Sequence, residues 1–207
     1  MLRPLSVLAL TLLMATPSVA ADPTRAGGFA DAVSRGFFDM ESMAPLQAQV
    51  ARITIGDLTV GMEETPLTDI AAALGGPINN EGEAGEHMVW TCYGAGRSTI
   101  WFMSDGEMGD GKLTIFSVEA RTPRSDWNCG TLAADIAINA GIPGLAAASS
   151  DVRAKVGPAV ADANGRFSYT GEAPSKTEYG FTIYQDVVYE ERDGAIVAFA
   201  IEQLSEG

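Results

Sequence analysis

A helix-ending pattern that occurs twice constrains the fold of this chain more than any other feature. Residues 68–77 read TDIAAALGGP and residues 150–158 read SDVRAKVGP, so each copy runs from a hydroxyl residue and Asp to Gly-Pro. Glycine can adopt the left-handed conformation that ends a helix, and proline cannot continue it. We therefore expect a short helix in each segment and an internal repeat built around it.

Segments that favour β-strands follow each helix, because they are rich in aromatic and β-branched residues. In the first copy they are 87–93, 99–103 and 112–121, and in the second they are 166–170, 179–184, 187–191 and 195–204. Asp193–Gly194 is typical of a tight hairpin between the last two. The pattern predicts an α+β protein of two tandem units, each with short helices packed on an antiparallel meander sheet.

The N-terminal segment is expected to be a signal peptide spanning 1–20. Arg3 precedes an apolar run from Leu5 to Ala15, and Ser18–Ala20 supplies the small residues of a cleavage site. We expect a protein exported to the bacterial periplasm or secreted, with no membrane span and, since no cysteine stands at the cleavage point, no lipid anchor.

The remaining chain divides into three parts. Residues 21–50 are predicted to form an N-terminal linker and short helix, 51–130 the first unit and 131–207 the second, which would open with a helix over 131–140. The net charge of −14, from 27 acidic and 13 basic residues, argues against a nucleic-acid partner because a phosphate backbone would be repelled.

The only two cysteines, Cys92 and Cys129, are expected to form a disulfide. Two cysteines in an exported chain most often pair, because the compartment is oxidising. A thiol held in a disulfide cannot act as a nucleophile, which argues against a cysteine hydrolase.

In its order of elements the chain resembles the β-lactamase inhibitory protein fold. The resemblance rests on the two helices that end in Leu or Val, Gly and Pro, each ahead of an antiparallel sheet, and it covers about Ile53 to Leu204. The same unit occurs singly in small outer-membrane assembly lipoproteins. The resemblance implies a non-catalytic protein that acts by binding another periplasmic or secreted protein, and no contact residue of the family aligns with this sequence.

The predicted strands are apolar on both faces, although a sheet covered on one side only should alternate. Trp90 lies on one face, for example, while Val89 and Tyr93 lie on the other. Either an aromatic binding surface is exposed, or the two sheets or residues 22–50 cover the second face. The candidate binding residues are four aromatics, Trp90, Tyr93, Trp101 and Tyr184, and two acids, Asp105 and Asp110, from the loop between segments 99–103 and 112–121.

Catalytic and cofactor motifs are incomplete in this sequence. Residues 106–112 have the spacing of a phosphate-binding loop, but Leu113 stands where Ser or Thr would hold magnesium. His87 is the single histidine, so a conventional zinc site lacks ligands. We expect no cofactor, no metal and no catalysis. The alternative is a small-ligand-binding protein or a carboxylate-based hydrolase that uses a cleft between the two units.

Overall fold

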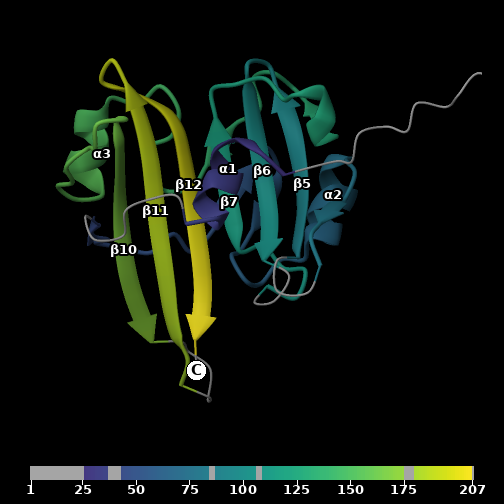
Figure 1. The fold of residues 1–207 in the computed structure, drawn as a ribbon, viewed down its shortest axis with the longest axis horizontal. Helices are drawn as coiled ribbons and strands as arrows, with labels where there is room; N and C mark the ends of the chain where they lie inside the picture. The colour runs from purple at the N-terminus through teal and green to yellow at the C-terminus, as the bar shows by residue number, and fades with distance from the viewer. Residues whose placement is uncertain (1–25, 37–42, 84–86, 106–108, 175–179, 207) are drawn as a thin grey trace, which may run out of the picture.

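A nine-stranded mixed sheet forms the body of the protein (Figure 1). The computed structural model describes residues 26–36, 43–83, 87–105, 109–174 and 180–206. The strands follow one another across the sheet in the order β1 (Ala44–Pro45), β10 (Arg166–Pro174), β11 (Thr182–Arg192), β12 (Ala195–Glu206), β7 (Ile115–Glu119), β6 (Ser98–Asp105), β5 (Met88–Ala95) and β4 (Asn79–Glu81), and β8 (Gly130–Leu132) also pairs with β5. Most pairs are antiparallel, whereas β1 and β8 pair in parallel with β10 and β5.

In the described part of the chain, a smaller sheet and three short α-helices pack around this sheet. The small sheet has the order β3 (Leu58–Val60), β2 (Ile53–Ile55) and β9 (Ile138–Asn139). The helices are α1 (Gly28–Ser34), α2 (Leu67–Leu74) and α3 (Ser149–Lys155), and a 3₁₀ helix covers Ser125–Trp127. Within the described ranges, no helix is long and apolar enough to cross a membrane.

The predicted architecture of two tandem helix-on-meander units is wrong. β7 and β12, the last strands of the two predicted units, pair antiparallel from Glu119↔Ala198 to Ile115↔Glu202 and merge both halves into one sheet. Both strands carry apolar residues on both faces, so neither suits a solvated sheet edge. Their pairing satisfies backbone groups that an isolated meander would leave open.

The segment between the two halves also departs from the prediction. Residues 131–140 form no helix: Gly130–Leu132 pairs with β5, and Ile138 pairs with Ile55 of β2. The predicted boundary between residues 130 and 131 therefore lies inside strand β8. The two repeated helices are present as α2 and α3, and Gly75 ends α2 with a φ of 73°, whereas α3 ends at Val156 in the right-handed region.

One face of the large sheet carries the main hydrophobic core. Aromatic side chains from six strands pack there, among them Phe102, Phe116 and Phe199. The small sheet, α2 and α3 cover this face with Ile53, Ile55, Val60, Leu67, Ile70, Val152 and Val156. Strands from both halves of the chain contribute apolar side chains to this core. The opposite face of the sheet is also covered, so the strands carry apolar residues on both faces.

The opposite face is covered by α1 and by the 3₁₀ helix. Figure 1 shows α1 lying across β7 and β12, where Phe29 and Val33 pack on Val188, Ala198 and Ala200. Next to them, Ala26, Ala30 and Trp127 pack on Trp90, Cys92, Trp101, Met103 and Ile115. Residues 26–34 thus account for the second apolar face, one of the two explanations that the sequence left open.

Two glycines and a buried carboxylate hold the start of α1 on the sheet. A side chain at Gly28 would overlap the carboxylate of Glu119, and one at Gly27 would overlap the Trp127 ring. Gly28 also has a φ of 72°, which disfavours other residues. Glu119 accepts a hydrogen bond from Trp101 Nε1 at 3.0 Å, so the helix, the carboxylate and the indole form one contact.

The predicted disulfide between Cys92 and Cys129 is confirmed. It joins β5 to the segment that follows the 3₁₀ helix, and the Cys92 sulfur lies in the same cluster as Trp127. The bond therefore fixes the cover of the second face as well as closing a 37-residue separation. The predicted signal peptide, 1–20, lies outside the described residues.

Candidate functional site

Three of the four predicted surface aromatics belong to the core. Trp90, Tyr93 and Trp101 each have 0% of their surface exposed. Trp101 packs edge-on against Trp127 with ring centroids 4.9 Å apart, and Tyr93 packs against Phe102 on the other face. The prediction that these three residues form a binding surface is wrong. The sequence could not show this, because the pattern of aromatic residues along a strand is the same whether a face meets solvent or another segment of the chain.

The other three predicted residues do not form one surface. Tyr184 is 36% exposed and lies near the free end of β11, paired with Leu204 of β12. Asp110 is exposed, with a φ of 46°, in the turn ahead of β7. Asp105 ends β6 and is half-buried on the face that α1 covers.

A group of carboxylates that the sequence analysis missed lies beside Asp105. Asp186 and Glu202 are cross-strand partners on β11 and β12. Burial, followed by the neighbouring charges of Asp186 and Asp105, raises the pKa of Glu202 to about 7. Burial also raises the pKa of Asp186, against a hydrogen bond from Thr170. The three residues are far apart in sequence, so only the strand register reveals the group.

An apolar pocket of about 340 Å³ opens on the opposite face of the sheet. It lies between the sheet and the connection from β8 to α3, residues 133–148, which we term the strap. The sheet contributes Ala95, Ser98, Val118 and Phe199, and the strap contributes Ala134, Ile136, Ile138, Ala140, Ile142, Gly144 and Leu145. The pocket is therefore lined by residues of both predicted units, 51–130 and 131–207. The alternative prediction had placed a ligand site between these two segments.

Local contacts hold the strap in an extended course over the sheet. β9 pairs with β2, the Tyr189 hydroxyl donates to the Pro143 carbonyl at 3.1 Å, and the Asn139 side chain accepts from the Gly141 amide at 2.9 Å. The side chains of Ile136, Ile138 and Leu145 remain half-buried. The pocket lies between this extended segment and the large sheet.

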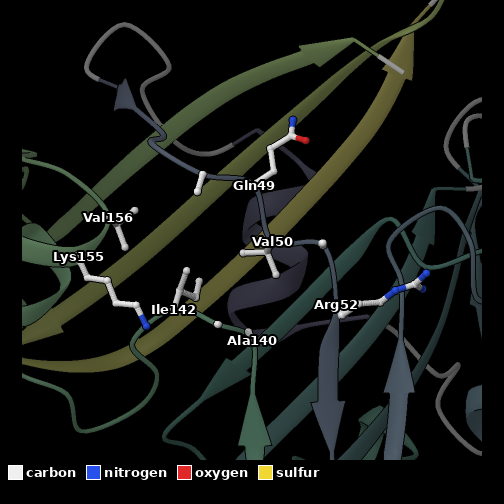
Figure 2. Close-up of a pocket in the computed structure, with 10 residues that line it drawn as sticks. Gln49, Val50, Arg52, Ala140, Ile142, Lys155 and Val156 are labelled. Atoms are coloured by element: carbon white, nitrogen blue, oxygen red, sulfur yellow. The ribbon is translucent and has the colours of Figure 1, made fainter. Parts of the chain in front are cut away.

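A smaller pocket of about 190 Å³ adjoins the apolar pocket (Figure 2). The two share Ala140 and Ile142 of the strap. Figure 2 shows Lys155 and Arg52 on opposite sides of the smaller pocket, and Arg52 is paired with Glu64 at 2.6 Å. The two pockets thus place a space lined by apolar side chains next to Lys155 and the Arg52–Glu64 ion pair.

The lining of the apolar pocket suits binding rather than chemistry. Its lining side chains are aliphatic or aromatic apart from the hydroxyl of Ser98, and polar backbone atoms also reach the pocket surface. A general acid, general base or metal needs titratable or ligating groups next to the substrate. The carboxylates Asp105, Asp186 and Glu202 lie on the other face of the sheet, so they do not reach this space.

Comparisons with known proteins do not identify a family or a related site. No family model, curated protein or solved structure matches the chain. The resemblance to the β-lactamase inhibitory protein fold therefore stays a prediction, and the site has to be interpreted from its own geometry.

Proposed function

We propose that this protein is an exported, non-enzymatic binding protein that holds a small apolar ligand between the strap and the large sheet. The observation that carries the proposal is the apolar pocket of about 340 Å³, to which both halves of the chain contribute. Export to the periplasm or beyond is part of the proposal. It is supported by the signal-like sequence of 1–20 and by the disulfide, which is typical of oxidising compartments.

The size and lining of the pocket define the ligand class. An apolar cavity of ~150 Å³ already takes up benzene. A space of about 340 Å³ therefore suits a larger ring system or a short acyl chain. Each Å² of apolar ligand surface buried contributes about 25 cal/mol, so affinity should follow the apolar area of the ligand.

The test is a titration of the mature protein with N-phenyl-1-naphthylamine, an uncharged dye that fluoresces in apolar surroundings. We expect saturable one-to-one binding by the wild type. Ser98→Phe places a ring in the mouth of the pocket and should weaken binding about tenfold, or 1.4 kcal/mol. Thr59→Phe is the matched control, because Thr59 is an exposed strand residue away from the pocket.

Two results would overturn this assignment. One is the lack of saturable binding by the wild type, and the other is full dye affinity in a Ser98→Phe protein whose far-ultraviolet circular dichroism is unchanged. If Ser98→Phe does not fold, Leu145→Gln tests the same wall from the strap side. An unchanged affinity in that variant would equally contradict the proposal.

A second candidate function is binding of another secreted or periplasmic protein. It is favoured by exposed aromatic residues near the start of β11. Tyr184 and Phe181 are 36% and 37% exposed there, and exposed aromatics are typical of protein interfaces. The resemblance described above implies the same kind of partner. Crosslinking in the native periplasm should then capture a defined partner with the wild type and lose it with Tyr184→Ala. Equal capture by both proteins would exclude this surface.

A further inference from the structure

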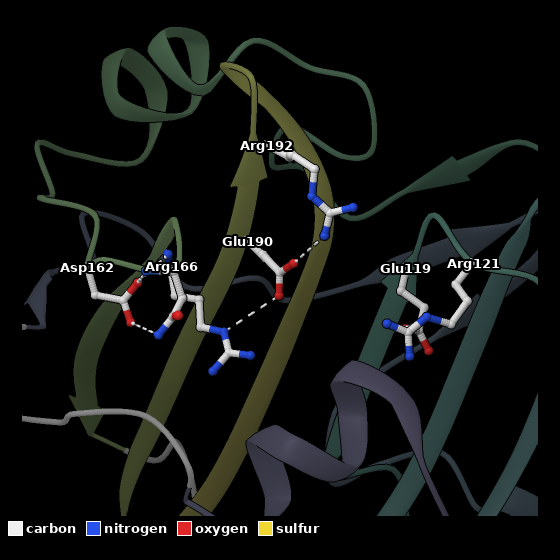
Figure 3. Close-up of polar contacts among 7 residues, drawn as sticks. Glu119, Arg121, Asp162, Arg166, Glu190 and Arg192 are labelled. Atoms are coloured by element: carbon white, nitrogen blue, oxygen red, sulfur yellow. Dashed lines mark hydrogen bonds and ion pairs between the residues drawn. The ribbon is translucent and has the colours of Figure 1, made fainter.

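A further pocket, of about 330 Å³, lies on the face of the sheet that carries α1 (Figure 3). Its charged walls are Arg121, Arg166 and Arg192 together with Glu119 and Glu190. Gly28, Phe29 and Ala32 of α1 close one side. In Figure 3, Arg166, Glu190 and Arg192 form a chain of ion pairs, and Glu119 and Arg121 lie together beside it.

This pocket gathers arginines in a chain that has few basic residues. The sequence has 13 Lys and Arg against 27 Asp and Glu. Three of those 13 line one pocket, where they face two carboxylates. The walls therefore carry an excess of positive charge on a protein whose net charge is −14. Such an excess of positive charge among the described lining residues favours binding of an anion at this pocket.

The two carboxylates are engaged in ways that limit how far they neutralise the arginines. Glu119 accepts a hydrogen bond from Trp101 and another from the backbone of Phe29, and burial raises its pKa. Glu190 is shared, because one oxygen lies 3.5 Å from Arg166 Nε and the other 3.2 Å from Arg192 Nη2. One carboxylate thus holds α1 in place, and the other serves two guanidinium groups.

The ion pairs of the pocket have N–O distances between 3.2 and 3.8 Å. Arg121 Nε lies 3.8 Å from Glu119, whereas Arg124 lies 2.7 Å from Asp126 in a pair outside the pocket. The side chains of Arg121 and Arg192 are 62% and 70% exposed. A guanidinium group has five N–H donors in a planar fork that matches the oxygens of a carboxylate or phosphate. Arg121 and Arg192 therefore retain donors for a further acceptor.

We propose that this pocket is a binding site for a small oxyanion, a carboxylate or phosphate group, held by Arg121 and Arg192, with Arg166 contributing its charge. The site is separate from the apolar pocket, since Glu119 and Ala198 face the charged pocket whereas their neighbours Val118 and Phe199 face the apolar one. The two sites can therefore be tested independently of each other.

The experiment is calorimetric titration of the mature protein with citrate and, separately, with inorganic phosphate, at an ionic strength held constant with sodium chloride. We expect saturable binding of at least one of the two, and the stronger of them identifies the source of the oxyanion. Arg192→Gln should weaken that binding about tenfold, the cost of one charge-assisted hydrogen bond. Arg192 is mostly exposed, so the variant should fold.

Arg124→Gln is the matched control. Arg124 is 66% exposed and ion-paired, as Arg192 is, but it does not line the pocket. Its replacement should change the affinity by less than about twofold. Equal weakening by both variants, or no saturable binding of either anion, would overturn the proposal. Dye binding in the apolar pocket should persist in Arg192→Gln, which separates failure of one site from failure of the other.

Discussion

Replacing Glu202 with Gln should stabilise the protein at alkaline pH and leave it nearly unchanged at acidic pH. Burial and the charges of Asp186 on β11 and Asp105 on β6 raise the pKa of Glu202 from 4.5 to about 7. The native state therefore favours the protonated acid. As the pH rises from about 4.5 to 7, the unfolded chain loses this proton and the native protein keeps it, so stability falls over this range.

The size of the effect follows from the shift. A difference of about 2.5 pKa units corresponds to roughly 3 kcal/mol at 1.36 kcal/mol per unit. Because Glu202 is half-buried, water screens part of this penalty. We expect Glu202→Gln to raise the free energy of unfolding by about 1–3 kcal/mol at pH 8 and by under ~0.5 kcal/mol at pH 4.5.

Urea denaturation followed by far-ultraviolet circular dichroism measures this difference at both pH values. Glu206→Gln is the matched control, because it makes the same change at the exposed end of the same strand. It should shift the free energy of unfolding by under ~0.5 kcal/mol at either pH. An advantage of Glu202→Gln that is as large at pH 4.5 as at pH 8 would refute the reasoning, since packing and not ionisation would then be its source.

Three further changes test the cover of the second face. Gly28→Ala should lower the free energy of unfolding by about 2–4 kcal/mol, because it strains a positive φ and overlaps Glu119; a loss below ~0.5 kcal/mol in urea denaturation would show that α1 is not held as described. Replacing Cys92 and Cys129 together with Ser should cost about 3–4 kcal/mol by the loop-entropy relation, and the same midpoint in urea with and without the bond would contradict this. Trp101→Phe removes a donor from the buried carboxylate of Glu119 and should cost about 1.5–3 kcal/mol, whereas a neutral result in thermal unfolding would mean that water replaces the indole.

Local features of the fold could be predicted from the sequence because their causes are local. Gly75 ends α2 with the positive φ that its position in the repeat indicated. Asp193 and Gly194 both have positive φ in the hairpin between β11 and β12, as the Asp-Gly pair required. The compartment argument was enough to pair Cys92 with Cys129. In each case a few adjacent residues, or a chemical rule, determine the outcome.

The assembly of these pieces could not be predicted because it depends on contacts between distant residues. Strands that are apolar on both faces fit a sheet with an exposed aromatic surface and a sheet with two covers equally well. The pairing of Phe116 with Ile201 decides between one sheet and two, and no local signal specifies it. Residues 131–140 were predicted to be the opening helix of the second unit, but they pair with β5 and, through Ile138, with Ile55 of β2 instead.

The candidate sites were missed for the same reason. The apolar pocket needs residues from β5 to β12 that come together only when β7 and β12 pair. Arg121, Arg166 and Arg192 stand apart in the sequence and belong to no motif. A signal was present in the scarcity of basic residues, since Arg166 begins β10, Arg192 ends β11 and Arg121 follows β7, and these three are part of only 13 Lys and Arg.

All three tryptophans of the chain, Trp90, Trp101 and Trp127, lie in the single cluster beneath α1 that also contains Cys92. Tryptophan fluorescence therefore reports on one region of the molecule, whereas circular dichroism averages over every strand. If α1 undocks before the sheet melts, the emission will change at a lower denaturant concentration than the ellipticity, and the gap between the two curves measures the independence of that helix.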